Sequence, residues 1–197
     1  NIYEIFEKPL IKILASMEIA GIKVDEEFLK KLSTKFQKKI NSVEKEIFKI
    51  SKKEFNIGST KQLGEIMYNE LKISSLKKTK KGSFATSASV LEDLVFKGHK
   101  LPKLVLDWRQ VTKLKNTYSD SLPEHINPNT KRVHTSFLLA ATTTGRLASS
   151  DPNLQNIPIK SKEGKEIRKA FIADKKNVLI SADYNQIEMR ILADMAD

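Results

Sequence analysis

The spacing of apolar residues predicts a pair of long helices in the first two thirds of the chain. Between residues 28 and 50 apolar side chains recur at steps of three and four, which is typical of one helix face. At 1.5 Å per residue this helix would be roughly 40 Å long, with Asp25 as its N-cap. A near-heptad seam of this kind requires a long antiparallel partner, which residues 101–118 can supply. The seam residues are Phe28, Leu32, Phe36, Ile40, Val43, Ile47 and Ile50 in the first helix and Leu104, Trp108, Val111 and Leu114 in the second.

Shorter helices and a few strands complete the predicted fold, which is α+β and mostly α. Pro9 is expected to kink or interrupt the first helix, and Gly21 to end it. Ser59 and Gln62 form a capping-box pattern, and Ser87 or Ser89 caps a later helix. The shorter helices are expected at residues 2–20, 59–71 and 87–98. After a boundary rich in Pro and Asn at 123–129, strands are expected at 133–139, 171–172 and 178–182.

The segment from residue 178 to residue 190 combines a strand pattern, a carboxylate and a helix pattern. Val178 begins a short apolar run that reads as a buried strand, and Asp183 follows at its end. Beyond it Ile187, Ile191 and Met195 recur every four residues and share one helix face. A carboxylate at such a junction can hold Mg²⁺, which needs one or two protein carboxylates together with phosphate oxygens. The alternative is that Asp183 only caps the helix.

Composition excludes several classes of protein. The chain has 197 residues, of which 40% are hydrophobic and 30% charged, and no apolar run approaches the ~20 residues that span a bilayer. It contains no Cys, which excludes disulfides, thiolate catalysis and Cys-ligated zinc. The His residues are scattered, without metal-ligand spacing. The N-terminus lacks both a secretory signal and an initiator Met, so we expect a piece of a longer protein.

The formal net charge of +11 favours a polyanionic partner. Lys greatly outnumbers Arg, and a Lys-rich surface is also typical of a face that is simply solvated. The basic stretch at residues 77–81 can likewise be read as a DNA contact or as a solvated loop.

Two motifs, in a fixed order and spacing, resemble those of the family-A DNA polymerases, the DNA polymerase I class. DYNQIEMR at residues 183–190 is similar to the first catalytic motif of that family, and TGRLASSDPNLQNIP at 144–158 is similar to its primer-template segment. Residues 55–63, 86–91 and 113–123 resemble the thumb of these enzymes. The resemblance implies an N-terminal palm-associated helix at 1–24, a helical thumb with two long antiparallel helices at 25–124, and part of an antiparallel palm sheet at 125–197.

The resemblance also implies a function, which is template-directed DNA synthesis from dNTPs on primer-template DNA with two Mg²⁺ ions. Asp183 would be the first catalytic carboxylate, and the carbonyl of Tyr184 a further metal ligand. Gln186 and Ile187 would line the nucleotide pocket. Glu188 would exclude a 2′-hydroxyl; its alternative is a favourable acid near a helix N-terminus.

For DNA binding, the resemblance assigns Arg146 to the minor groove at the primer terminus, where every base pair presents acceptors. An Asx- and Pro-rich surface turn is the alternative for this segment. In the thumb, residues 59–61 begin a helix and would contact a phosphate. The full set of candidate DNA-binding residues is Thr144, Arg146, Asn153, Gln155, Asn156, Lys160, Ser59, Thr60, Lys61, Lys113, Asn116, Thr117 and Tyr118.

Departures from the family pattern limit these expectations. Ala148 stands where Ser is usual, Leu139 where Gln is common, and Lys160 where Arg is frequent. No segment resembles the fingers helix or the His-Asp-Glu motif with the second carboxylate. We therefore expect the isolated chain to be inactive and to self-associate through exposed palm surface. We expect no membrane contact, and a cytoplasmic, nucleoid-associated location or an organelle. The alternatives are a non-catalytic nucleic-acid-binding module and, more weakly, a single-subunit RNA polymerase.

Overall fold

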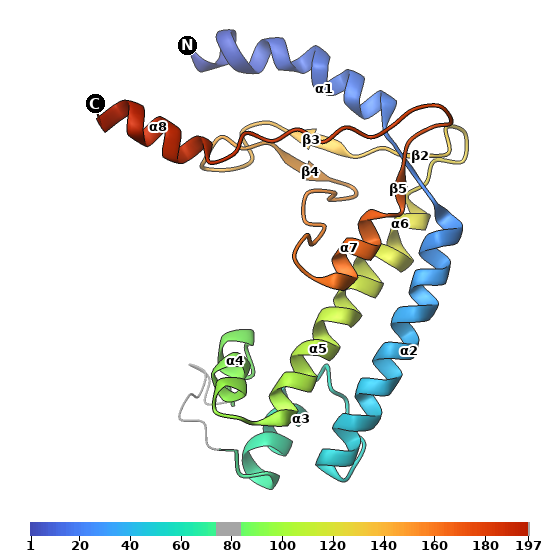
Figure 1. The fold of residues 1–197 in the computed structure, drawn as a ribbon, viewed down its shortest axis with the longest axis vertical. Coiled ribbons are helices and arrows are strands. Elements are labelled where there is room, and N and C mark those ends of the chain that lie inside the picture. The colour runs from blue at the N-terminus through green and yellow to red at the C-terminus, as the bar shows by residue number, and fades with distance from the viewer. Residues whose placement is uncertain (74–83, 197) are drawn as a thin grey trace.

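A long helical arm carries a small strand-containing region at one end, and the whole molecule curves into a C shape (Figure 1). The computed structural model describes residues 1–73 and 84–196. The predicted basic stretch at 77–81 lies outside the described residues. The elements are η1 (Tyr3–Glu7), α1 (Lys8–Ala20), β1 (Ile22–Val24), α2 (Glu26–Ser51), α3 (Thr60–Gly64), η2 (Glu65–Glu70), α4 (Ala88–Phe96), α5 (Lys100–Leu114), η3 (Lys115–Asp120), α6 (Ser121–Glu124), β2 (Arg132–Val133), β3 (Ser136–Leu138), β4 (Ala148–Ser150), α7 (Lys162–Arg168), β5 (Phe171–Ile172) and α8 (Ile187–Ala196), where η marks a π-helical turn.

Helices α2 and α5 form the antiparallel pair that the apolar spacing predicts (Figure 1). Asp25 caps α2 as expected, because its carboxylate accepts a hydrogen bond of 2.9 Å from the Phe28 N–H. The phase of the two seams differs slightly from the prediction. Leu29 is completely buried whereas Phe28 is half-buried, and on α5 Val105 is buried whereas Trp108 is half-buried.

The apolar core is divided into two clusters along the arm. One cluster lies near the strands, where the N-terminal half of α2 packs on the end of α5, on η3 and on α7. It includes Leu32, Phe36, Leu114 and Ile167. The other lies at the far end of the arm, where α2 and α5 pack on α3, η2 and α4. Half-buried Trp108 touches both clusters, and its indole N–H donates to Glu44 on α2 at 2.9 Å.

Capping at the far end of the arm follows the prediction only in part. The Ser59 hydroxyl accepts from the Gln62 N–H at 3.4 Å, as an N-cap should. The Gln62 side chain, however, accepts from the Asn56 N–H at 2.8 Å and not from the N–H of Ser59. The helix that begins there continues through η2 to Glu70, close to the predicted end. Ser87 is the N-cap residue of α4, but its side chain makes no capping bond.

The strands form two small antiparallel sheets, one with the order β2-β1-β5 and one made of β3 and β4. Gly21 ends α1 and leads directly into β1. It has φ of +57°, and a Cβ there would lie 2.7 Å from the Val133 carbonyl oxygen, so glycine is needed for both reasons. Arg132 closes this corner by donating to the Ala20 and Gly21 carbonyls and to Asp174.

Several strand predictions are wrong. The predicted strand 133–139 is divided between β2 and β3, which belong to different sheets, and β4 and α7 appear where no element is predicted. Residues 178–182 are extended but pair with no strand in the described part of the chain. Val178 and Ile180 are 78% and 88% exposed, so this run is not the predicted buried strand. An apolar run becomes a strand only when a neighbouring strand satisfies its backbone groups.

Helix α8 begins where the four-residue spacing predicts, but its apolar residues Ile191 and Met195 are exposed. Across residues 1–73 and 84–196, no helix has the length and apolar content that crossing a membrane requires.

Candidate nucleic-acid interface

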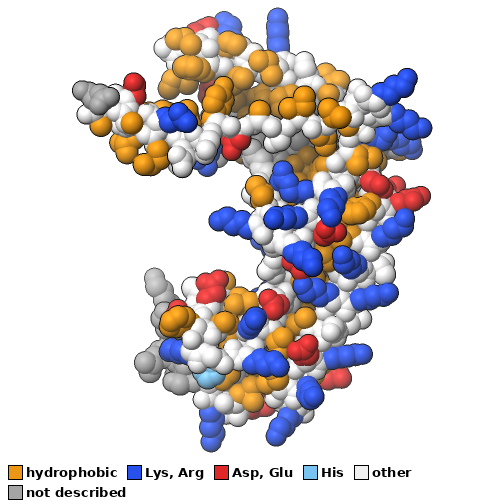
Figure 2. Space-filling view, in the orientation of Figure 1, with side chains coloured by type: hydrophobic (Ala, Val, Ile, Leu, Met, Phe, Trp, Pro, Cys, Tyr) orange, Lys and Arg blue, Asp and Glu red, His pale blue; other side chains and the backbone are white. Residues whose placement is uncertain are grey.

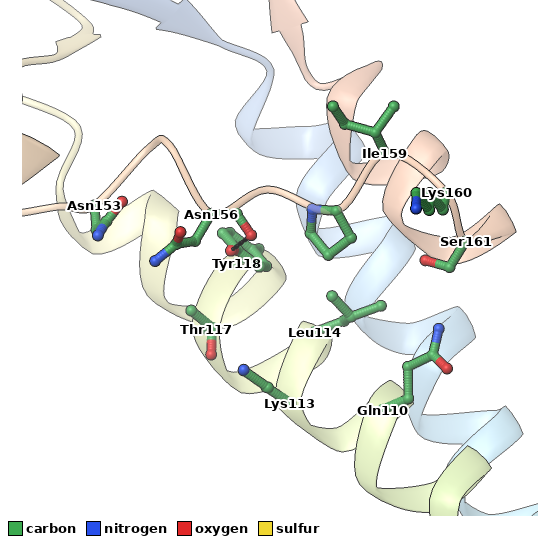
Figure 3. A pocket seen from close by; sticks show the side chains of 11 residues that line it. Gln110, Lys113, Leu114, Thr117, Tyr118, Asn153, Asn156, Ile159, Lys160 and Ser161 are labelled. Carbon is green, nitrogen blue, oxygen red and sulfur yellow. Dashed lines mark hydrogen bonds between the residues drawn. The ribbon is translucent and has the colours of Figure 1, made fainter. Parts of the chain in front are cut away.

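A groove of about 700 Å³ lies between the α5–η3 helix and the segment that precedes α7 (Figure 3). Gln110, Lys113, Leu114 and Thr117 line it from the helix side, and Asn153, Asn156 and Lys160 from the other side. The groove therefore brings together candidate DNA-binding residues that are about forty positions apart in the sequence. Those candidates are Lys113, Thr117, Tyr118, Asn153, Asn156 and Lys160.

The cationic and amide side chains that line this groove are exposed to solvent. Lys113 and Lys160 are exposed, as are the side chains of Asn153, Asn156 and Thr117. On the concave side of the molecule, lysine and arginine side chains gather over α7 and the adjacent part of α5 (Figure 2). The arrangement suits an extended polyanion, because cations and amide donors face one open channel.

Tyr118 is the exception among the groove residues, because it is only 3% exposed. Its hydroxyl donates a hydrogen bond of 2.5 Å to the Asn156 carbonyl oxygen, and burial raises the pKa of the phenol. The side chain therefore ties η3 to the opposite wall of the groove, and its hydroxyl is already used.

Helix α7 packs against the groove wall that residues 153–160 form. The Ser161 hydroxyl caps this helix by accepting from the Gly164 N–H at 3.1 Å. A Cβ at Gly164 would lie 2.5 Å from the Pro158 carbonyl oxygen, so the helix and the groove wall are in direct backbone contact. An ion pair between Glu163 and Lys39 anchors α7 to α2, and the hydrogen bond from Lys39 lowers the pKa of the Glu163 carboxyl.

Arg146 lies in the connection between β3 and β4. Gly145 precedes it with φ of +71°, a backbone conformation that favours glycine. The Thr142 hydroxyl donates to the Arg146 carbonyl oxygen at 2.9 Å, while the guanidinium remains exposed and lies 3.3 Å from the Glu188 carboxylate. Thr144 is exposed in the same loop. The structure thus places the candidate primer-terminus residue next to the candidate sugar-selecting residue.

The remaining candidates near the C-terminus lie on an exposed segment and at the start of α8. Asp183 precedes α8 by four residues, and Gln186, with φ of +54°, is the residue directly before the helix. Tyr184 is 84% exposed and Ile187 40% exposed. Within residues 1–73 and 84–196 no three acidic or imidazole side chains come together as metal ligands. The predicted metal ligands, Asp183 and the Tyr184 carbonyl, therefore have no cluster of further acidic or imidazole ligands around them in the described part of the chain.

At the far end of the arm, Ser59, Thr60 and Lys61 begin α3. The Ser59 hydroxyl is engaged in its cap, whereas Thr60 and Lys61 are exposed. Asn116 is exposed on η3 but does not line the groove. These residues thus lie outside the groove.

Comparisons with known proteins decide the family. Residues 26–197 match the model of DNA polymerase family A. The chain belongs to DNA polymerase family A. It is 53% identical to a DNA polymerase I of Rhizobium leguminosarum over its whole length, 49% identical to that of Caldicellulosiruptor bescii, and 44% identical to the thermostable DNA polymerase I of Thermus aquaticus over 99% of its length. It spans about a fifth of these relatives, from 19% to 23% of their lengths.

A solved structure in the same family has a closely similar fold. It is the POL domain of Pol1 from M. smegmatis, in complex with DNA primer-template and dNTP. The two chains are 38% identical and superpose with a TM-score of 0.86, over 98% of this chain and 34% of the other. The family resemblance and the mostly helical α+β fold predicted from the sequence are therefore confirmed.

Some residues that line the groove were not among the sequence candidates. Gln110 lies three and seven residues before Lys113 and Thr117, so the helical spacing of those two candidates could have identified it. Ser161 could have been found from its position three residues before Gly164, a typical N-cap spacing. Ile159 carries no such signal, because its position depends on how the segment before α7 turns.

Proposed function

We propose that this chain is the part of a family-A DNA polymerase that grips primer-template DNA during template-directed synthesis from dNTPs. The observation that carries the proposal is the groove, where candidates from the α5–η3 helix and from residues 153–160 meet around one open channel. The similar structure in complex with DNA primer-template and dNTP supports the same reading.

Within this proposal the groove residues have different roles. Lys113 and Lys160 neutralise backbone phosphates, and Asn153 and Asn156 donate from their amides. Thr117 in the groove and Asn116, which lies on η3 outside the groove, add polar contacts to the same strand. Their exposure leaves all these side chains free to reach a ligand.

Two further contacts lie outside the groove. Arg146 reaches the minor groove at the primer terminus, helped by Thr144 in the same loop. At the far end of the arm, Ser59, Thr60 and Lys61 approach a phosphate at the start of α3. The proposed division is an N-terminal palm-associated helix at 1–24, a thumb at 25–124 and part of the palm at 125–197.

For the chemical step, we propose that Asp183 and the Tyr184 carbonyl would contribute to holding Mg²⁺, which when bound would activate the primer hydroxyl and neutralise the triphosphate. Gln186 and Ile187 face the nucleotide, and Glu188 excludes a ribose 2′-hydroxyl. Because no segment of the sequence resembles the fingers helix or the motif that carries the second catalytic carboxylate, we expect no primer extension by the 197-residue chain alone. Robust templated extension in Mg²⁺ by the pure chain would refute this expectation.

The decisive experiment is a titration of labelled primer-template followed by anisotropy across a salt series. We expect tight binding at low salt that weakens steeply, because each neutralised phosphate contributes about 0.9 to the log–log salt slope. Lys113→Ala and Lys160→Ala should each reduce that slope by about one contact. The matched control is Lys45→Ala, an exposed lysine on α2 outside the groove. An equal effect of all three variants, or no binding at low salt, would overturn the proposal.

We also propose that the isolated chain self-associates through the apolar surface of its N- and C-terminal helices. Phe6 and Ile13 near the N-terminus are 63% and 54% exposed, and Leu192 and Met195 on α8 are 59% and 79% exposed. Exposed apolar patches of this kind are typical of interaction surfaces. A concentration series in sedimentation velocity should reveal oligomers, and a monomer at all concentrations would contradict this.

A further inference from the structure

Gln155 lies between two groove-lining asparagines, but it does not line the groove with them. We infer that Gln155 is a positioning residue, whose effect on DNA binding passes through Arg146. The inference rests on the proposed function, and it changes the role that the family resemblance assigns to Gln155.

Both polar groups of the Gln155 side chain are already bonded to the strand that follows Arg146. Its Nε2 donates to the Leu147 carbonyl oxygen at 2.9 Å, and its Oε1 accepts from the Ser149 N–H at 3.1 Å. These two hydrogen bonds, which we call the clamp, fix the backbone on either side of Ala148. Each polar group of the amide therefore has a fixed backbone partner, which holds the side chain in one orientation and leaves one N–H and one oxygen lone pair unused.

The residues around Gln155 fix the clamp in place. Asn153 accepts from the Gln155 N–H at 3.0 Å, and the Ser149 hydroxyl accepts from the Leu154 N–H at 2.9 Å. Ser149 is only 4% exposed, and its hydroxyl also accepts from Thr135 at 3.1 Å. The base of the clamp is therefore a buried polar network, which resists displacement.

One residue before the clamp, the Thr142 hydroxyl donates a hydrogen bond of 2.9 Å to the Arg146 carbonyl oxygen. Side-chain donors thus bind the consecutive carbonyls of Arg146 and Leu147. The backbone at Arg146 is fixed, whereas its side chain is 76% exposed. This arrangement presents a guanidinium from a rigid base, so less ordering is needed when it binds.

A double-mutant cycle on the 197-residue chain tests the inference. Gln155→Met keeps the length and removes both hydrogen bonds, and Arg146→Ala removes the presented cation. We expect Gln155→Met to weaken binding of primer-template about three- to tenfold in the wild-type background. In the Arg146→Ala background the same change should have no further effect. A matched control is Asn156→Ala, which should weaken binding equally in both backgrounds.

A second readout separates positioning from loss of fold. Arg146 faces the primer terminus in the proposed function, so the wild type should prefer a matched over a mismatched terminal pair. Gln155→Met should lower this ratio as Arg146→Ala does, whereas general destabilisation would weaken both complexes alike. Gln155→Glu, which keeps only the acceptor for the Ser149 N–H, should be intermediate.

The outcomes are distinguishable. Equal losses from Gln155→Met in both backgrounds would show a direct DNA contact, and no loss in either would show that the clamp is not used; each overturns the inference and leaves the groove proposal intact. A wild-type chain that does not bind primer-template, or that shows no preference for the matched terminus, overturns the proposed function itself.

Discussion

The hydrogen bond between Tyr118 and Asn156 joins the two walls of the groove, so its removal should affect stability and DNA binding together. Tyr118→Phe keeps the buried ring and deletes the hydroxyl, which leaves the Asn156 carbonyl oxygen without its 2.5 Å partner. Losing one partner of this partly buried hydrogen bond costs ~1–2 kcal/mol. For a chain of this length that corresponds to a fall in Tm of roughly 3–6 °C.

The effect on DNA affinity follows from the same bond. Without it the segment that carries Asn153 and Asn156 is no longer fixed to η3, so it must be ordered when DNA binds. If about 1 kcal/mol of ordering moves to the binding step, affinity falls roughly fivefold. Thermal melting and anisotropy with primer-template measure the two effects on the same samples.

The chain offers a matched control for this change. The Tyr68 hydroxyl donates to the Ala85 carbonyl oxygen at 2.8 Å, at the far end of the arm and outside the groove. Tyr68→Phe should lower Tm by a similar amount and leave DNA affinity unchanged. The reasoning is refuted if Tyr118→Phe retains wild-type affinity, or if both variants weaken DNA binding equally.

Three further substitutions test the packing, the groove wall and an ion pair. Leu29→Ala should destabilise the chain by ~2–5 kcal/mol in urea unfolding, because this side chain is completely buried. Gly164→Ala should cost ~1–3 kcal/mol and weaken DNA binding, because its Cβ would meet the Pro158 carbonyl at 2.5 Å. Burial of Asp120 raises its pKa, but the hydrogen bonds from Lys115, Ser33 and Ser119 and the charge of Lys115 together outweigh burial and hold the pKa of this carboxyl below 3.8. The stability that the ionised form provides is present above that value and lost as pH falls through the lower one, so Asp120→Asn should flatten the acid side of the urea-midpoint curve.

The helical arm could be predicted from the sequence because its signals are local. Gly21 ends α1 and Asp25 begins α2 through hydrogen bonds within a few residues, and all seven apolar positions predicted for the seam of α2 lie in or against the core. Local spacing does not decide which of two adjacent apolar residues faces the core. Adjacent Phe28 and Leu29 are both apolar, and only packing against α5 and the sheet decides which of them is buried.

The strands and the detailed roles of the candidates depend on distant contacts. An apolar run such as 178–182 looks like a strand in isolation, but the described residues place no partner beside it. Tyr118 and Gln155 have side chains typical of DNA-binding residues, yet their polar groups bond to backbone 38 and 8 positions away. A sequence motif specifies which residue types gather at a site, and the fold determines which of them remain free.

This distinction suggests an order of events for the chain. The groove is stabilised by hydrogen bonds that exist before any ligand arrives, such as those of Tyr118 and Ser161, whereas residues 178–183 are exposed and pair with no strand among the described residues. Binding surfaces that are already ordered require little conformational entropy on association, whereas a carboxylate on an unpaired extended segment must first be fixed before it can hold a cation in one geometry. We therefore expect the proposed DNA-binding groove to function before, and independently of, the proposed metal-binding carboxylate, so that Asp183→Asn leaves primer-template affinity unchanged in the absence of dNTP.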